Sequence, residues 1–432
     1  MYEALGFTKN PFFTDPLGAN EEDFEKFIGR TRDVHSYLAQ ITGREGCVHL
    51  VTGNPGVGKT SFVNIMQYVT CFGEPTKHFK DIKHTPTLLI SNTQKLQINS
   101  DETSQSLMLK ITSSIIYSLM AAYDKRKKPL PSEIERQHKR INEFITSTTS
   151  PSTGIQLGPV GGSYGGQATG YEGTSSVTIS HLTRAVQEMT DKSLADLNMN
   201  GLYVVINNLD IVEIDRLVKI LNELRDELFS IKALWIILLG SKGTYSAIKQ
   251  HEMGSRIVDN LRGTETFLES LSEEEAVDIL KIRARKLSQN PEKPTKLPIS
   301  EKVVREIYKH CDGEIRFLFK VCDQIVRTVL TRFPSLDTIS DEMAFEDLRP
   351  IVAEEMCLDL LSKKQKDLLT ALLDKPLRPK DHKLVKFASA PDFTNVASDL
   401  LKRRLVRKRE EGIAVYYEPA GQAILARYCG LI

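Results

Sequence analysis

The stretch Gly53-Asn54-Pro55-Gly56-Val57-Gly58-Lys59-Thr60 decides the fold of this chain. It matches the phosphate-loop pattern G-x-x-x-x-G-K-[ST], and a short apolar run at residues 48–51 precedes it. A helical pattern through Phe62, Ile65 and Met66 follows, so the loop joins a strand to a helix. Glycines in such a loop let successive backbone N–H groups turn toward phosphates at the helix N-terminus.

The residue types in this loop predict its ligands. Lys59 neutralises β- and γ-phosphates, and the Thr60 hydroxyl joins the coordination shell of a Mg²⁺ ion. ATP and Mg²⁺ are therefore the expected cofactors. The expected nucleotide contacts are Gly53, Asn54, Pro55, Gly56, Val57, Gly58, Lys59, Thr60 and Ser61.

Three further apolar runs extend this pattern. Residues 87–90, 202–206 and 233–239 are continuously apolar rather than alternating, and helical patterns separate them. Buried strands that alternate with helices predict a P-loop α/β fold with a parallel-sheet core.

The strand at 202–206 ends in Asn207-Asn208-Leu209-Asp210. At this place a phosphate-loop ATPase needs a carboxylate that holds Mg²⁺ through water and a second acid that activates the attacking water. Asn207 can hydrogen-bond a Mg²⁺-bound water, whereas Asn208 cannot accept a proton. We expect slow or absent intrinsic hydrolysis of ATP. The alternative is that Asp210 or Glu213 supplies the missing acid.

The rest of the chain is predominantly helical. Patterns at 273–287, 301–310 and 315–330 predict a helical lid, and later patterns predict a winged helix. The winged helix combines helices at 361–373 and 393–403, the second capped by Asp392, with strands at 405–407 and 415–417 around a turn at 411–412. The expected domains are an ATPase core at 1–267, a lid at 268–357 and a winged helix at 358–432.

A Gly-rich insertion at about 147–178 interrupts the core. Its glycines between 154 and 173 cannot fill a hydrophobic core, which indicates a flexible insertion. The alternative is a Gly-rich hairpin whose apolar residues contact a neighbouring subunit or DNA. Those residues are Tyr164, Tyr171, Val177 and Ile179.

Charge is divided unevenly along the chain. The 432 residues carry a net charge of +1, which excludes a uniformly basic nucleic-acid-binding protein. Residues 358–432, however, hold 15 Lys and Arg against 9 Asp and Glu, a net charge of +6, so the remainder carries −5. We expect contacts with the phosphates of double-stranded DNA through Arg403, Arg404, Arg407, Lys408 and Arg409. The alternative is a winged helix that docks an effector protein.

Cysteine spacing and hydropathy predict a cytoplasmic protein without a membrane span. The six cysteines form no CxxC pair, and the N-terminus lacks a charged-then-apolar signal segment. The most apolar runs have the length of a strand, well short of a bilayer span. The nine histidines show no metal-ligand spacing, which gives no support to a metalloenzyme.

Taken in order, these motifs resemble the AAA+ ATPases of the origin-recognition and replication-initiator group, which is related to the STAND ATPases. The resemblance rests on Asn10-Pro11-Phe12, on Phe27-Ile28-Gly29-Arg30 at the adenine-side entrance, on the phosphate loop, on Asp312-Gly313-Glu314-Ile315-Arg316 and on the winged helix. The Asn207-Asn208 pair and the Gly-rich insertion depart from the pattern of that group.

The resemblance implies roles for three residues outside the loop. Ser241 matches the polar sensor 1 residue near the γ-phosphate, and Arg316 matches the sensor 2 arginine of the lid. Arg256, with Arg262 as its rival, matches a subunit-bridging arginine, which implies self-association. The implied function is an ATP-binding switch that assembles on or near DNA and recruits or regulates a partner. The alternative is a STAND/KAP-like, nucleotide-gated scaffold for protein interaction.

Overall fold

A parallel β-sheet forms the centre of the computed structural model, which describes residues 1–42, 45–71, 89–91, 96–148, 155–156, 163–164, 178–261, 265–292, 296–336, 338–411 and 414–432. Its strands are β1 (Cys47–Gly53), β2 (Leu89–Ser91), β3 (Leu96–Gln97), β6 (Gly201–Asn207), β7 (Leu234–Leu239) and β8 (Glu265–Leu268). The order is β2-β6-β7-β1-β8, β3 also pairs with β6, and every pairing is parallel. The predicted α/β class with a parallel-sheet core is confirmed.

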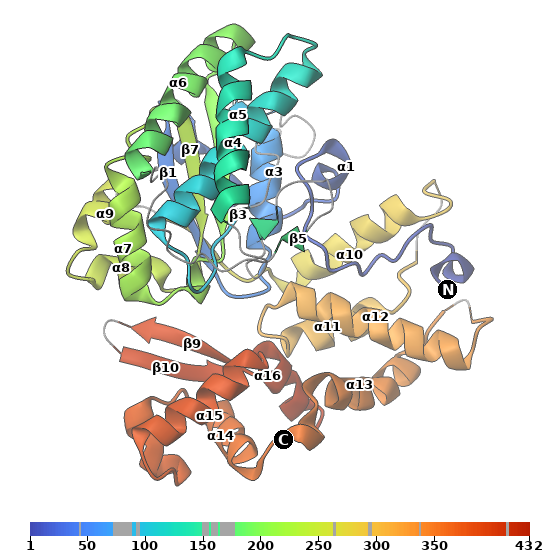
Figure 1. Ribbon diagram of the computed structural model, residues 1–432. Coiled ribbons are helices and arrows are strands. Elements are labelled where there is room, and N and C mark those ends of the chain that lie inside the picture. Colours follow the sequence, from blue (N-terminus) through green and yellow to red (C-terminus); the bar gives the residue numbers. More distant parts are fainter. Residues whose placement is uncertain are drawn as a thin grey trace.

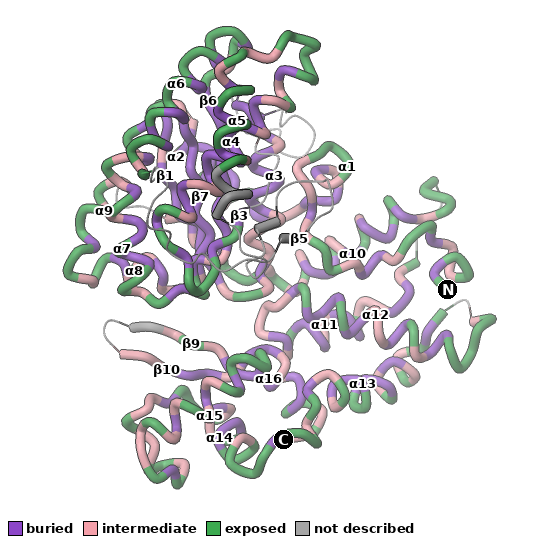
Figure 2. The backbone as a smooth tube through the Cα atoms, in the orientation of Figure 1, coloured by how far each residue is buried: buried purple, intermediate pink, exposed green. Residues whose placement is uncertain are grey.

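Burial on both faces explains why continuous apolar runs form these strands. Every residue of β6 and β7 is buried, as a parallel sheet covered by helices requires (Figure 2). One face packs against α2 (Thr31–Ile41) and α3 (Lys59–Cys71). The other face carries α4 (Ser104–Lys125), α6 (Ile179–Leu197), α7 (Ile214–Arg225), α8 (Thr244–Gln250) and α9 (Ser255–Asn260). Shorter or peripheral core helices are α1 (Glu21–Phe24) and α5 (Ser132–Thr148).

Helix α4 is the one described helix that is long and apolar enough to cross a membrane. Leu107, Ile111 and Ile115 on this helix belong to the core beside the sheet. Packing against the sheet therefore accounts for the apolar character of α4.

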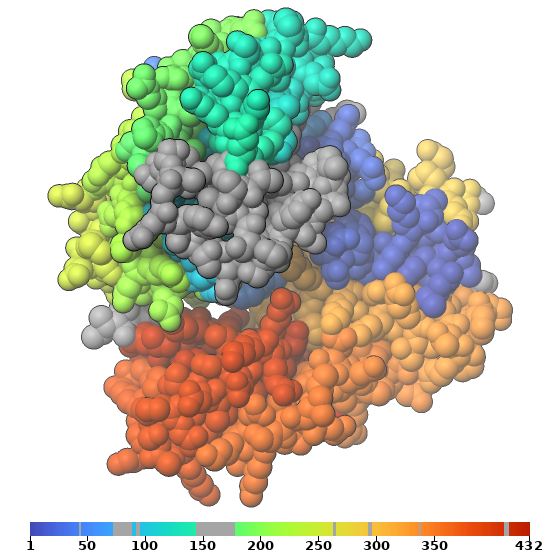
Figure 3. All heavy atoms as spheres, viewed as in Figure 1, coloured from blue at the N-terminus to red at the C-terminus, as the bar shows by residue number. Residues whose placement is uncertain are grey.

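Below and to the right of the sheet in Figure 1, four helices occupy the region predicted as a lid, a name kept for them here, and lead to the C-terminal unit. The lid comprises α10 (Glu273–Leu287), α11 (Glu301–Lys309), α12 (Ile315–Arg332) and α13 (Asp341–Met356). The C-terminal unit comprises η3 (Leu358–Leu360), α14 (Lys363–Asp374), η4 (Pro379–Val385), α15 (Ala390–Lys402), β9 (Val406–Glu411), β10 (Ala414–Pro419) and α16 (Gly421–Tyr428). The lid and this unit contribute side chains to one hydrophobic core, and they form a continuous body in the space-filling view (Figure 3).

The C-terminal helices and hairpin lie close to their predicted positions, but the predicted cap of the second helix is wrong. Helix α15 begins at Ala390, three residues earlier than expected, and the Ser389 side chain accepts a hydrogen bond from the Asp392 N–H. Asp392 lies in the first turn instead and pairs with Lys364 at 2.9 Å. The predicted turn falls partly on Gly412, outside the described residues.

The first residues of the chain pack against the lid rather than the sheet. Tyr2, Phe7 and Phe12 belong to the lid's hydrophobic core, and Tyr2 lies in the short helix η1 (Tyr2–Leu5). The Tyr2 hydroxyl donates to Asp323 of α12 at 2.5 Å, and the Asn10 amide donates to the same carboxylate at 3.1 Å. The N-terminal segment is therefore a second connection between the sheet and the lid, in addition to the chain that leads from β8 into α10.

Two short strands are described inside the Gly-rich insertion. They are β4 (Ile155–Gln156) and β5 (Ser163–Tyr164), which pair antiparallel. Tyr171 and Val177 lie outside the described residues, and Ile179 begins α6. The proposed contact of this insertion with a subunit or DNA stays a prediction.

Candidate nucleotide-binding site

The loop between β1 and α3 has the backbone that its glycines predict. Gly53, Gly56 and Gly58 adopt φ angles of 154°, 75° and 96°, a region that residues with a side chain rarely enter. A Cβ atom at Gly56 would stand 3.4 Å from the Cβ of Glu314, the residue that precedes α12 in the motif at 312–316. The loop therefore needs glycine for its conformation and lies in contact with the lid.

The Lys59 side chain folds into this loop. Its ammonium donates to the carbonyl oxygens of Gly53 at 2.9 Å and Asn54 at 3.1 Å. Burial lowers the pKa of Lys59 to about 8; the Asp210 carboxylate raises this pKa and the Arg316 guanidinium lowers it. Three predicted site residues from three parts of the chain thus lie within electrostatic reach of one another.

The end of β6 brings an amide to the same edge of the sheet. Strand β7 lies between β6 and β1, and all three run parallel, so their carboxyl ends share one edge. Asn207 is buried, and its Oδ1 has no hydrogen-bond partner within the described chain. An unpaired buried acceptor is costly unless a donor or ion meets it, so this oxygen fits a role beside hydrated Mg²⁺.

The two acids that could replace the missing catalytic carboxylate differ in their surroundings. Asn208 adopts a left-handed conformation with φ of 67° and leads into the short helix η2 (Leu209–Ile211). Asp210 in this helix is exposed, yet it acts electrostatically on Lys59. Glu213 is exposed and precedes α7 without making a side-chain cap. Of the two acids, Asp210 is the one linked to the loop.

Ser241 follows β7, the neighbour of the loop strand. The Gly240 N–H donates to Val51 at 3.0 Å, and the Lys242 N–H donates to Gly53 at 3.2 Å. These bonds fasten the segment that carries Ser241 to the start of the phosphate loop. The Ser241 hydroxyl itself lies 3.3 Å from the Thr244 hydroxyl.

Two residues from the N-terminal segment form hydrogen bonds with the phosphate loop and the start of α3. Arg30, buried and left-handed with φ of 56°, donates to the Val57 carbonyl at 2.7 Å and pairs with Asp33 at 3.0 Å. The Leu17 N–H donates to the Ser61 hydroxyl at 3.1 Å. The motif at 27–30 is visible in the sequence, but the contact of Arg30 with the loop arises only in the tertiary structure.

An aromatic cage lies where the N-terminal segment meets the lid. The Arg283 guanidinium is buried between the rings of Phe13 and Phe319, at 4.0 and 4.4 Å from their centroids. It donates to the Phe13 carbonyl at 2.8 Å, and burial lowers its pKa to about 10. Arg283 carries no signal of this role in the sequence, because its position in α10 is that of an ordinary basic residue of a helix.

Arg256 is exposed on α9, which packs against α7 and α8 on the far side of the sheet from α3. It lies outside the cluster formed by Lys59, Asp210 and Arg316. Its rival Arg262 lies outside the described residues. A bridging role would need a neighbouring copy of the chain.

The five predicted DNA contacts fall into two groups. Arg403, Arg404 and Lys408 are exposed. Arg407 is partly buried, donates to Glu418 at 2.7 Å and forms an ion pair with Asp312 of the lid. Arg409 lies 3.6 Å from Glu418 and over the Tyr416 ring. Exposure therefore favours the first group as phosphate contacts.

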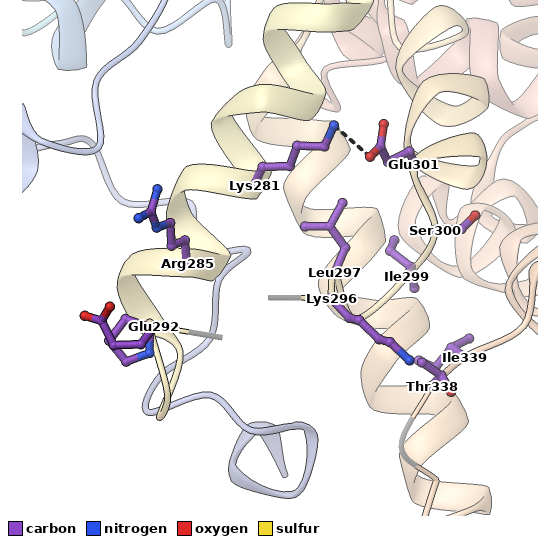
Figure 4. A pocket seen from close by; sticks show the side chains of 11 residues that line it. Lys281, Arg285, Glu292, Lys296, Leu297, Ile299, Ser300, Glu301, Thr338 and Ile339 are labelled. Carbon is purple, nitrogen blue, oxygen red and sulfur yellow. Dashed lines mark ion pairs between the residues drawn. The ribbon is translucent and has the colours of Figure 1, made fainter. Parts of the chain in front are cut away.

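A separate open pocket of about 700 Å³ lies within the lid (Figure 4). Lys281, Arg285 and Lys296 line it together with Glu301, and Lys281 pairs with Glu301 at 2.7 Å. None of the predicted site residues lines this pocket. The nucleotide site is therefore defined by the loop geometry and not by this cavity.

No protein-family model and no curated protein matches this chain. Among solved structures, the ORC2 protein of Aeropyrum pernix in its ADPNP–ADP complexes is similar over 98% of this chain and 96% of its own, with 12% identity and a TM-score of 0.44. Its ADP form covers 93% and 91%, with 12% identity and a TM-score of 0.40. A Walker-type ATPase of Pyrococcus abyssi covers 97% and 99%, with 14% identity and a TM-score of 0.49. At these values the likeness assigns no residue role to this chain.

Proposed function

We propose that the chain binds ATP with Mg²⁺ at the loop between β1 and α3. The observation that carries this proposal is the loop itself, where three glycines with positive φ precede a helix and the Lys59 ammonium lies inside the turn. Loop amides and the N-terminus of α3 suit phosphate oxygens. The Thr60 hydroxyl and, through water, the Asn207 amide would hold Mg²⁺, which neutralises phosphate charge when bound.

Nucleotide binding is tested by titrating the protein with a fluorescent ATP analogue. Lys59→Ala should abolish binding, because the phosphates lose their buried cation. Lys249→Ala removes the same charge from an exposed position on α8 and should bind as the unaltered protein does. Retained affinity in Lys59→Ala would refute the assignment of the site.

The proposed site has the groups needed to bind ATP, but it lacks a carboxylate at positions 207 and 208 for hydrolysis. An amide at Asn207 can orient a hydrated ion, but neither Asn207 nor Asn208 can accept a proton from water. We expect phosphate release far below about one turnover per second, at the slow end of enzymes. Turnover near that rate, lost in Asp210→Ala, would instead identify Asp210 as the catalytic base.

The nucleotide-bound protein is proposed to associate with double-stranded DNA through its C-terminal unit. Arg403, Arg404 and Lys408 are exposed in a unit of net charge +6. Arg403→Ala and Arg404→Ala should each weaken binding to a duplex and lower the salt slope by about one. Lys375→Ala, an exposed control in the same unit, should have little effect. Absence of duplex binding at low salt would end this part of the proposal.

The proposed assignment is to the AAA+ origin-recognition group, with a core at 1–267, a lid at 268–357 and a winged helix at 358–432. In that setting Arg256 would reach the nucleotide of a neighbouring copy, and the assembly would recruit a partner in the cytoplasm. Sedimentation with and without ATP tests self-association. Arg256→Ala should leave ATP binding intact and lower ATP-dependent assembly.

A second candidate is a nucleotide-gated scaffold whose C-terminal unit binds a protein. The observation that favours it is the pairing of Arg407 and Arg409 with Glu418, which reduces the charge available to DNA. ATP binding without any duplex affinity would favour this candidate.

A further inference from the structure

The segment between α11 and α12 lies between the phosphate loop and the C-terminal unit. On one side, Glu314 lies beside Gly56 of the loop, where an added Cβ atom would stand 3.4 Å from the Glu314 Cβ. On the other side, the Glu314 carboxylate accepts a hydrogen bond from the Gly421 N–H at the start of α16, at 3.0 Å. Gly421 also lies so close to the Cys311 carbonyl that a Cβ atom there would stand 2.1 Å from its oxygen. One short segment thus touches both sites.

An ion pair adds a second connection from this segment to the hairpin β9–β10. Arg407 of β9 pairs with Asp312, two residues before Glu314, while its Nε donates to Glu418 of β10. Burial lowers the pKa of Arg407, but the Asp312 and Glu418 carboxylates outweigh this and leave that pKa above its usual range. Arg407 is therefore a permanent cation between two carboxylates from different parts of the fold.

The same segment continues into the predicted sensor of the lid. Arg316 follows Asp312 by four residues and lies in the first turn of α12, and its charge already lowers the pKa of Lys59. Burial raises the pKa of Glu314, and the Arg407 and Arg404 guanidinium groups oppose this rise. The bonds that Asp312 and Glu314 make to the C-terminal unit therefore fix the start of α12, and with it Arg316, relative to the phosphate loop.

We propose that the Asp312–Arg407 ion pair and the Glu314–Gly421 hydrogen bond form a latch that ties the start of α12 to the C-terminal unit, and thereby keeps Glu314 and Arg316 in place beside the phosphate loop. Asp312 and Arg407 are then positioning residues for ATP, and Arg407 is not a DNA contact. This inference rests on the proposed binding of ATP, but not on the proposed binding of DNA. Because coupling between sites is reciprocal, ATP binding also strengthens the latch.

The test is a double-mutant cycle on ATP affinity, measured in the full chain without DNA. Arg407→Ala and Asp312→Asn should each weaken binding of the fluorescent ATP analogue about fivefold, and the double variant should be no weaker than either, because each change opens the same latch. Lys375→Ala removes an equal charge from an exposed position of the same unit and should leave ATP affinity unchanged.

Each other outcome overturns the latch. If Arg407→Ala weakens binding while Asp312→Asn strengthens it, and the double variant returns to the original affinity, the two residues act only through their charges on ATP. If thermal unfolding shifts while ATP affinity stays constant, the pair is merely structural. Failure of the unaltered protein to bind the analogue would refute the proposed function itself. This outcome is distinct from failure of the latch, because it is measured before any variant is compared.

Discussion

Lys59 lies in surroundings that make its charge depend on pH. Its ammonium is enclosed by two loop carbonyls, and burial lowers its pKa to about 8 against an ordinary 10.5. Between these two values the unfolded chain keeps the proton and the folded chain loses it. Folding stability therefore rises with pH across this window, while the cation needed for phosphate is lost.

ATP affinity should accordingly fall above pH 8 by up to about tenfold per pH unit, because binding must first return a proton to Lys59. Calorimetry in buffers of different ionisation enthalpy measures this proton uptake together with the affinity. Lys59→Arg keeps its charge at every pH used and should give a weaker but flat profile. A flat profile in the unaltered protein would contradict the assigned role of Lys59.

At the scale of single elements, α15 illustrates how a helix start is chosen. Asp392 and Ser389 are both good N-cap residues, and the sequence pattern favoured the one nearer to the apolar periodicity. The helix instead begins earlier, with Pro391 in its first turn and Ser389 as the cap. Asp392 then stands where a negative charge suits the helix dipole and pairs with Lys364.

Ser389→Ala should lower the free energy of unfolding by about 1 kcal/mol, because the Asp392 N–H loses its acceptor. Asp392→Ala removes an exposed ion pair and should cost about half as much or less. Urea denaturation followed by circular dichroism compares the two variants. A larger loss in Asp392→Ala would restore Asp392 as the cap.

At the scale of the molecule, the lid and the C-terminal unit behave as one packed body. Helix α16 lies against α13 of the lid and α14 of its own unit, and Leu425 is completely buried in their shared core. The hairpin β9–β10 extends toward α8 beside the parallel sheet, and β9 contacts this helix (Figure 1). The C-terminal unit is therefore joined to both of the other parts.

Leu425→Ala should destabilise the protein by about 3 kcal/mol, because it leaves a cavity in the shared core. Since that core is continuous, hydrogen exchange should accelerate in α13 as well as in α16. Leu360→Ala, at a leucine that is 70% exposed, should change the unfolding free energy by less than about 0.5 kcal/mol. Faster exchange confined to α16 would show that the two parts unfold separately.

Local patterns in the sequence were sufficient for the main elements of the fold. Continuous apolar runs predicted β6 and β7, and the glycine spacing predicted the loop at 53–60. Both signals depend only on residues that are neighbours in the chain. Strand β8 and helix α16 were not predicted from the sequence. Strand β8 has only four residues, two of them buried, and α16 has eight, too few for a clear period.

The sequence by itself determined that this chain has a phosphate loop on a parallel sheet, with two asparagines where acids are usual. Only the tertiary structure decided which distant residues meet that loop. Arg30 donates a hydrogen bond to the loop, and Glu314 lies beside it. Arg407 pairs with Asp312, two residues before Glu314. Such pairings join segments far apart in the chain, and they arise from packing and charge in three dimensions, which no local period records.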